Sequence, residues 1–567
     1  MNASNFFGVD FHGLDVLEQV DHQIQQHIKA TFAAIPERYH ADIAEIYKDK
    51  HKNLSPRDAN LYFLDLQDEI KPTFNFSDEA LERKAERMAK ACHKIVKQDG
   101  LEAGISYAEA QGIDQPTATT ETGVKNRLSC PAWWKRQLTS QQKREQGAFA
   151  LRIGIIGKGK HQQLYCSNAA HEERLAREER TRKALARKEA VYGEGEDEEV
   201  VNMLDLLDAS LANPKNRFAE IYTCAKGFEG YGNDNDHICQ MITITCPSRM
   251  HSNSYKYDGT TPREAQKYLS ELWARARATF KDNGIYPYGF RVVEPHGDGC
   301  PHWHIWLFTP QDQQAKLNAI LEDHALRVDG TEKGAEEHRI EFEAIDLSKG
   351  SARSYLFKYI SKNLEGFGVG EDFESDGQDA KDTAPRVKSW ASKWGIRQIQ
   401  QVGGSPIGVW RELRRCKDEL SGIMEKARIC AHAGDWQGYF ELQGGHEVPK
   451  SKQPIQVLRK LNADAETGEV ELNYYGEPLE RVKGLICEGQ EVITRLKEWT
   501  IRDIETGDEI IFETIPDFDL LEPNPDNTLT DEFFFYDDPD LLYGNPFLKA
   551  ESASFSRPWI IRDNCRE

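Results

Sequence analysis

The chain has 567 residues, enough for several domains and too many for a single minimal module. Hydrophobic residues make up 39% of it, no run of 18 or more apolar residues occurs, and the N-terminus does not have the pattern of a secretory signal. The 11 cysteines form no CxxC pair, as expected of reduced thiols. We therefore expect a cytoplasmic protein without a membrane partner.

The net charge of −22 would ordinarily argue against a nucleic-acid ligand, because lysine and arginine neutralise phosphates when such complexes form. The charge is unevenly distributed, however. Residues 125–188 contain 16 lysines and arginines and 5 acidic residues, whereas residues 501–567 contain 17 acidic and 5 basic residues. This segregation permits contact with DNA despite the overall charge.

Residues 1–120 have apolar positions at helical spacing and are predicted to form a helical N-terminal domain. The clearest segments are LDVLEQVDHQIQQHIKATFAAI and DEALERKAERMAKACHKIV. Residues 121–216 are predicted to be a basic helical and linker region, with a charged helix at 171–190 and an acidic break, GEGEDEE, at 193–199. The helix is more typical of a solvated charged face than of a DNA-binding strut.

Residues 217–365 change to alternating strands and helices. ICQMITIT, residues 238–245, alternates as a half-buried strand does, and a capping box at Thr261 begins a helix that should stop at Gly284. Two β-rich runs, GFRVVE and HWHIWLF, follow on either side of the hairpin turn PHGDGCP. The helix QDQQAKLNAILEDHA, the strand RIEFEAID and the helix SARSYLFKYISKNL complete the region.

The order β-α-β-β-α-β-α matches a split ferredoxin-like arrangement. The predicted fold class is therefore α+β, with an antiparallel sheet that carries helices on one face and leaves the other free for a site. Residues 366–385 are rich in glycine and aspartate and are expected to be a loop, at the start of a Trp- and Arg-containing extension over 366–445. Residues 446–567 form an acidic C-terminal region without a recognisable chemical motif.

A candidate metal site lies in the hairpin. His302 and His304 are two residues apart on one strand, so both imidazoles project to the same side. If the turn is centred near Asp298, Glu294 lies opposite His302 and could add a carboxylate, with His296 as the competing third ligand. Such a set with open positions suits Mg²⁺ or Mn²⁺ at a phosphate better than a closed zinc site.

The segment YLFKYISK repeats a Tyr-x-x-Lys unit. Tyr355 and Tyr359 lie four apart on one helix face, and Lys358 and Lys362 follow them at the same interval. A tyrosine hydroxyl is a poor nucleophile at neutral pH, so attack on a phosphodiester needs a cation for the developing oxyanion and a metal at the phosphate. Lysine and metal would meet those needs, although a tyrosine pair alone is more often core packing.

Two other interpretations each conflict with one residue. A histidine-triad nucleotide hydrolase needs a third histidine at the position that Trp306 occupies. GIIGKGKH, residues 154–161, has the spacing of a phosphate-binding P-loop, but His161 replaces the serine or threonine that would bind Mg²⁺.

Four segments together carry a family resemblance: MITITCPS, RVVEPHGDGCPHWHIWLF, SYLFKYISKN and WASKWGIRQIQQVGGSPIGVWRELRR. Over about residues 217–415 the chain resembles the HUH endonucleases, and among them the two-tyrosine rolling-circle initiators of the bacteriophage replication gene A protein family. The resemblance implies a HUH endonuclease domain at 217–365, with His302 and His304 as metal ligands and Tyr355 and Tyr359 as nucleophiles.

In that family one tyrosine nicks a strand at the phage origin and stays joined to the 5′ phosphate, which leaves a 3′-hydroxyl primer, and the second tyrosine serves termination and rejoining. The implied partners are single-stranded or nicked DNA at a replication origin and the helicase and DNA polymerase of the bacterial host. The alternatives are a non-cutting origin-binding protein, which would need neither tyrosines nor histidines, and a two-tyrosine relaxase or transposase, which shares the chemistry.

Overall fold

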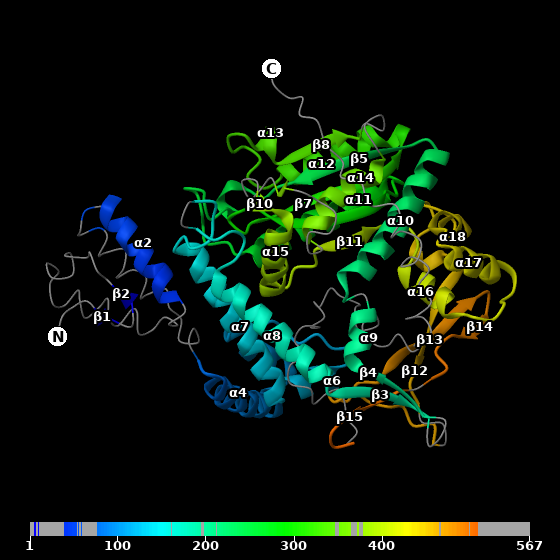
Figure 1. The fold of residues 1–567 in the computed structure, drawn as a ribbon, viewed down its shortest axis with the longest axis horizontal. Coiled ribbons are helices and arrows are strands. Elements are labelled where there is room, and N and C mark those ends of the chain that lie inside the picture. The colour runs from blue at the N-terminus through cyan, green and yellow to red at the C-terminus, as the bar shows by residue number, and fades with distance from the viewer. Residues whose placement is uncertain are drawn as a thin grey trace.

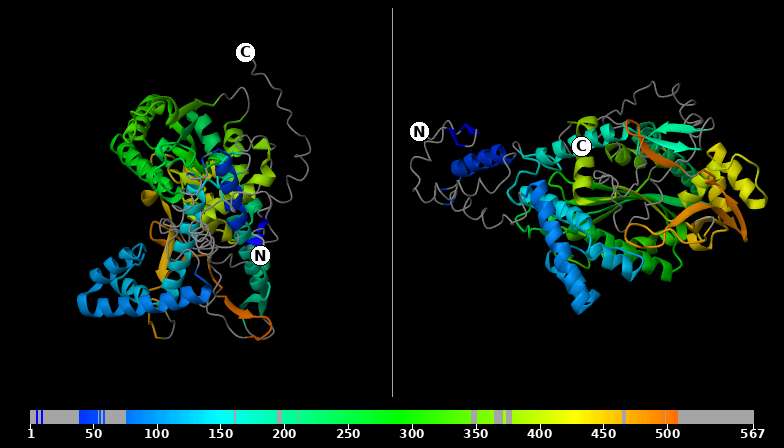
Figure 2. Two further views of the ribbon diagram at one scale, coloured as in Figure 1. Left: turned by 90° about the vertical axis from the view of Figure 1, so that its left-hand side faces the viewer. Right: turned by 90° about the horizontal axis from the view of Figure 1, so that it is seen from below.

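The computed structural model of the chain has a central sheet, N-terminal helices on one side of it and a C-terminal sheet on the other (Figure 1). Both Figures 1 and 2 place helix α4 well away from the central sheet. The structure describes residues 5–6, 9–10, 39–53, 55, 58 and 76–507, except 160–161, 194–197, 211, 346–350, 364–370, 373–377, 464–466 and 498.

The central sheet is five-stranded and antiparallel, with the order β11-β6-β7-β5-β8. This confirms the α+β class and the four strands predicted within residues 217–365. The fifth strand, β11, comes from the extension, where the short segment IQQV gives little strand signal. The strands are β5 (His237–Ile244), β6 (Tyr288–Pro295), β7 (Pro301–Pro310), β8 (Ile340–Ala344) and β11 (Ile399–Val402).

Helices cover both faces of this sheet, so the prediction of a free face is wrong. Trp303 and Ile305 pack with α11 and α12 on one face, and Trp306 and Phe308 pack with α10 and α14 on the other. All of β6 is buried, and HWHIWLF is apolar or aromatic throughout, which is the pattern of a strand covered on both sides. The helices are α10 (Pro214–Asp234), α11 (Pro262–Asp282), α12 (Gln314–Leu326) and α14 (Ala352–Asn363).

The N-terminal region is helical where it is described, apart from the short paired strands at Asn5–Phe6 and Val9–Asp10. Helix α4 confirms the second predicted segment, and its N-cap Ser77 accepts a hydrogen bond from the Ala80 backbone N–H. The first segment, residues 14–35, lies outside the described residues. The helices are α2 (His40–Asn53), α4 (Asp78–Asp99), α5 (Leu101–Ala110), α6 (Glu121–Leu128), α7 (Pro131–Arg152) and α8 (Asn168–Leu185).

The predicted basic helix at 171–190 ends earlier than expected, at Leu185. Residues Lys188–Tyr192 instead form β3, which pairs with β4 (Glu199–Asn202) and with β15 (Thr500–Asp503). The acidic break therefore joins two strands. The valines and tyrosine around it favour strands, which is a signal that the charge pattern obscures.

Regular structure also begins inside the predicted loop at 366–385, because α15 starts at Ala380. The acidic region contains a three-stranded sheet in the order β12-β13-β14.

Among the described helices, none has both the length and the apolar character needed to cross a bilayer. The remaining elements are β1 (Asn5–Phe6), β2 (Val9–Asp10), α9 (Met203–Ala209), α13 (Ala335–His338), β9 (Glu371–Asp372), β10 (Gln378–Asp379), α15 (Ala380–Trp394), α16 (Ile407–Arg415), α17 (Gly422–Ala433), α18 (Trp436–Leu442), β12 (Ile455–Leu461), β13 (Glu480–Cys487) and β14 (Gln490–Ile493).

Glu477 connects the segment between β12 and β13 to the N-terminal helices by hydrogen bonds. Its side chain is 5% exposed and accepts hydrogen bonds from Thr119 N at 2.6 Å, Arg127 at 2.7 Å and Asn473 at 2.9 Å. Gly123 permits this approach, since a Cβ there would lie 2.4 Å from a carboxylate oxygen. Burial raises the pKa of Glu477, but these hydrogen bonds outweigh it and lower that pKa to about 2.

We expect Glu477→Gln to lower the free energy of unfolding by about 1–3 kcal/mol at neutral pH, because the donors around residue 477 lose a charged acceptor. The pKa of Glu477 is lowered from 4.5 to about 2, so its contribution is present above pH 4.5 and is lost as the pH falls through about 2. Urea midpoints of the wild type and the variant should therefore converge on acidification. Glu480→Gln, an exposed change nearby, is the control, and an equal shift in both variants would contradict this role.

Candidate active site and metal centre

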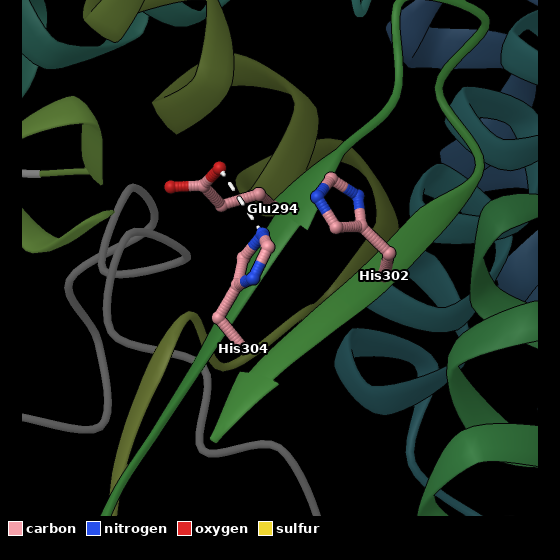
Figure 3. A group of neighbouring side chains, drawn as sticks. All are labelled: Glu294, His302 and His304. Carbon is pink, nitrogen blue, oxygen red and sulfur yellow. Dashed lines mark ion pairs between the residues drawn. The ribbon is translucent and has the colours of Figure 1, made fainter. Parts of the chain in front are cut away.

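The β6–β7 hairpin brings three potential metal ligands together. Glu294 pairs directly with His302, so the turn is centred at Asp298 as the sequence predicts, and His304 lies two residues further along the same face. The ligand atoms of Glu294, His302 and His304 lie within 4.8 Å of one another. Figure 3 shows the three side chains converging above the two strands.

All three side chains are buried: Glu294 is 3% exposed, His302 4% and His304 7%. Two imidazole nitrogens and one carboxylate oxygen at this separation fit a divalent cation, and a tetrahedral or octahedral ion would keep open positions. His296, the competing ligand, stacks on His302 with ring centroids 4.0 Å apart. Among the described residues, the group with metal-ligand geometry contains Glu294 and does not contain His296.

His304 is held from two sides. Its Nδ1 lies 3.1 Å from Thr243 Oγ1 on β5, and its Nε2 lies 3.8 Å from Glu294 Oε2 (Figure 3). The contact with Thr243 orients the ring and leaves Nε2 directed at the carboxylate. Thr243 is a supporting residue that the sequence prediction did not single out, although the alternation of MITIT puts it on a defined face of the strand.

Helix α14 carries Tyr359 onto the site. Trp306 Nε1 donates to Ala352 O at 2.9 Å and fixes the start of the helix against β7. One end of the helix thus meets Trp306, while further along the Tyr359 ring stacks on His304 with centroids 4.0 Å apart. Burial, followed by the charges of Glu294 and of acidic residues on β8, raises the pKa of Tyr359 to about 12.

The other predicted residues of α14 are placed differently. Tyr355 lies one turn before Tyr359, about 6 Å along the helix, and also packs against the core beneath it. Lys358 is exposed, with Nζ 5.8 Å from the Tyr359 ring centroid. The side chain of Lys362 lies outside the described part of the structure. The structure therefore brings one of the two tyrosines into ring contact with the histidine pair.

The glycine- and lysine-containing segment at 154–161 follows the end of α7, and the next helix begins only at Asn168. A P-loop connects a strand directly to a helix, so this segment lacks the required context. Residues 160–161 lie outside the described residues. The sequence had already disfavoured an ATPase at this position.

The model of the family described as bacteriophage replication gene A protein (GPA) matches residues 66–367. The replication protein of Haemophilus phage HP1 (strain HP1c1) is 37% identical over 388 residues, covering 66% of this chain and 48% of that protein. The replication gene A protein of Escherichia phage 186 is 33% identical over 394 residues, which cover 66% of this chain and 55% of that protein. A probable replication endonuclease from a prophage-like region of Salmonella paratyphi A (strain ATCC 9150 / SARB42) is 30% identical over 385 residues, which cover 64% of this chain and 48% of that protein.

The match spans about half the length of these curated relatives. No solved structure matches the chain.

The buried position of Tyr359 predicts an unusual titration. With its pKa raised to about 12, the ¹³Cζ resonance of Tyr359 should keep its neutral-phenol shift at a pH where a tyrosine in a short peptide is largely ionised. Glu294→Gln should lower that pKa, because it removes a negative charge that disfavours the phenolate. Labelled-tyrosine NMR, assigned with Tyr359→Phe, measures both effects. Ionisation of Tyr359 together with the peptide would contradict the packing described above.

Proposed function

Because the chain belongs to the bacteriophage replication gene A protein family, we propose that it initiates phage DNA replication as a metal-dependent, site-specific single-strand endonuclease and strand transferase. The observation that carries this proposal is the stack of Tyr359 on His304 beside Glu294 and His302. A candidate nucleophile and a polar ligand set thus lie side by side, and the exposed Lys358 precedes the tyrosine on the same helix. The name of the Salmonella relative, a probable replication endonuclease, agrees with this activity.

The order of the central strands supports a HUH nuclease core. Strands β6-β7-β5-β8 lie in the order that a split β-α-β-β-α-β unit requires, and β11 extends the sheet beside β6. In this ferredoxin-like arrangement the histidine pair occupies a central strand, and the tyrosine helix crosses the same face. A rigid sheet is a suitable support for a site whose ligands must stay within a few tenths of an ångström.

Glu294, His302 and His304 would hold Mg²⁺ or Mn²⁺. When bound, such an ion polarises the scissile phosphate and stabilises the charge that develops on its oxygens. The contact of Thr243 with His304 keeps Nε2 directed at the site. Three protein ligands leave positions for phosphate oxygens, as an ion acting on a substrate needs.

We assign the attack to Tyr359, and its stack on His304 supports this choice. Its phenol oxygen would form a bond to phosphorus while the bond to the 3′ oxygen breaks, so that the 5′ phosphate stays on tyrosine and the strand end leaves as a 3′-hydroxyl with a proton. Because the pKa of Tyr359 is about 12, the resting residue is a neutral phenol that must lose its proton during attack. Lys358 and Lys362 would neutralise the developing charge.

Tyr355 would act in the second transfer, when one DNA end is already attached to the enzyme. One phosphodiester is exchanged for another at each step, so rejoining needs no ATP. The partners of this cycle are single-stranded or nicked DNA at the origin, a host helicase that unwinds the duplex and a host DNA polymerase that extends the 3′-hydroxyl.

The nucleophile assignment is tested with tiled single-stranded oligonucleotides from the gene and its flanks, incubated with Mn²⁺ and resolved on denaturing gels. We expect a slower covalent band with wild type, mapped by mass spectrometry to Tyr359. Tyr359→Phe should lose most of the first adduct, Tyr355→Phe should impair rejoining, and the double variant should form none. An adduct that persists in the double variant would refute the assignment, and DNA binding without any adduct would favour a non-cutting binder.

The metal assignment is tested separately by calorimetric titration of the full chain with Mn²⁺. His302→Ala and Glu294→Ala should each weaken binding at least about tenfold, because each removes one of three protein ligands. His338→Ala, which removes an 82% exposed histidine that is not part of the ligand set, is the control. Unchanged Mn²⁺ affinity in both ligand variants would exclude this site.

A further inference from the structure

A second polar hollow borders the metal site at the β6–β7 turn. Three separate segments contribute to it: the loop after α7, the loop after β5 and the turn itself. The residues that matter here are Lys158, Ser248, His251, His296, Gly297 and Asp298.

We propose that this hollow binds a backbone phosphate of single-stranded DNA within a few nucleotides of the scissile phosphate, and that Tyr255, which directly follows the lining residue Ser254, stacks on the adjoining base. The proposal rests on the proposed function, since it locates part of the substrate of that site. Lysine, imidazole and hydroxyl groups are the donors that phosphodiesters use in protein complexes, and single strands are commonly held by such groups together with aromatic platforms.

A continuous row of rings connects the hollow with the nucleophile. His251 and His296 have centroids 5.1 Å apart, and His296 and His302 are 4.0 Å apart. The row continues from His302 to His304 at 4.6 Å and from His304 to Tyr359 at 4.0 Å. The hollow is therefore the direct continuation of the site, so a strand attacked by Tyr359 reaches it within a few nucleotides.

Gly297 determines where Lys158 lies. A Cβ on Gly297 would be 2.3 Å from Lys158 Cγ and 2.7 Å from its Cε, so the lysine stem lies flat on the turn only because residue 297 has no side chain. The Gly297 carbonyl also accepts a hydrogen bond from Tyr165 N at 3.2 Å, which ties the two segments together. The contact with the turn thus restricts the exposed side chain of Lys158 to the hollow that His251 and His296 also line.

Asp298 lines the hollow and orients His251. Its side chain is 4% exposed, and its carboxylate faces His251 Nδ1 at 3.2 Å and accepts from Cys300 N at 3.0 Å. Although burial raises the pKa of Asp298, the contact with His251 and the backbone N–H hold it below its ordinary value. The carboxylate therefore engages the Nδ1 edge of His251, and the opposite Nε2 edge is left for a ligand.

Tyr255 stands on the same loop as His251 and is 95% exposed. The Lys256 ammonium lies 5.8 Å from its ring centroid. A large aromatic ring this exposed contributes little to the core, whereas stacking on an unpaired base would bury one of its faces. Tyr255 directly follows Ser254, which lines the hollow, and this neighbourhood suits the base attached to a phosphate bound there.

The test is fluorescence anisotropy of a labelled oligothymidylate of about 15 nucleotides with the full chain in EDTA, so that binding is measured without cleavage. Lys158→Ala and Tyr255→Ala should each weaken binding about tenfold, whereas Tyr255→Phe should bind like wild type. Lys158→Ala should also reduce the slope of log affinity against log salt by about 0.7, as loss of one phosphate contact predicts.

The matched control is Lys281→Ala. Lys281 lies near the end of α11, a helix of 21 residues and about 30 Å whose first residue, Pro262, is next to the turn. This exposed lysine is therefore remote from the hollow, and its loss should leave affinity and slope unchanged.

Gly297→Ala tests the Lys158 contact without removing a charge. The φ of Gly297 is outside the left-handed region, so alanine suits the backbone, and its Cβ should displace the lysine. Binding should weaken in the wild-type background and change little further in Lys158→Ala. Wild-type affinity and salt slope in these variants, or no binding by wild type, would overturn the proposal. Loss of binding in the variants without a tyrosine adduct in wild type would overturn the nuclease instead.

Discussion

The pairing of Glu294 with His302 is the constraint on which the candidate active site depends. A shift of one residue in the β6–β7 register would turn the carboxylate to the opposite face of the sheet from the histidines. The turn fixes this register: His296 N donates to Cys300 O at 2.8 Å, and Gly299, at φ 82°, adopts a conformation that favours glycine. A short turn thus sets the geometry of the metal ligands and, through His296, of the adjoining hollow.

The helices that pack on both faces of the central sheet add a second constraint. Glu294 and His304 lie between packed tryptophans and helices, where a carboxylate is costly to bury without compensating partners. In the proposed function, a divalent cation held between them would offset that cost. The same burial raises the pKa of Tyr359 to about 12, so the phenol is neutral at physiological pH.

Local patterns predicted the elements of residues 217–365 and the hairpin register, because helical spacing, capping residues and strand alternation are encoded over a few residues. The sequence could not predict β11, whose pairing with β6 joins residues more than a hundred positions apart. It could not separate Tyr355 from Tyr359 either, since both lie on one helix face. Their difference arises from where Trp306 holds Ala352 and so sets the position of the helix along β7. That is a tertiary contact without a local signal.

In the basic segment at residues 125–188, some of the arginines form hydrogen bonds and ion pairs with other parts of the protein. Arg174 is 5% exposed and donates to Ser389 on α15 at 2.8 Å. Arg182 forms a two-pronged ion pair with Asp208 at 2.7 and 2.9 Å. With a net charge of −22 over the whole chain, affinity for DNA must then come from a small number of placed cations and rings rather than from a broad electropositive surface. In the proposed function, the groups around the β6–β7 turn and on α14 would supply those cations and rings, and the same residues would position the strand and hold it.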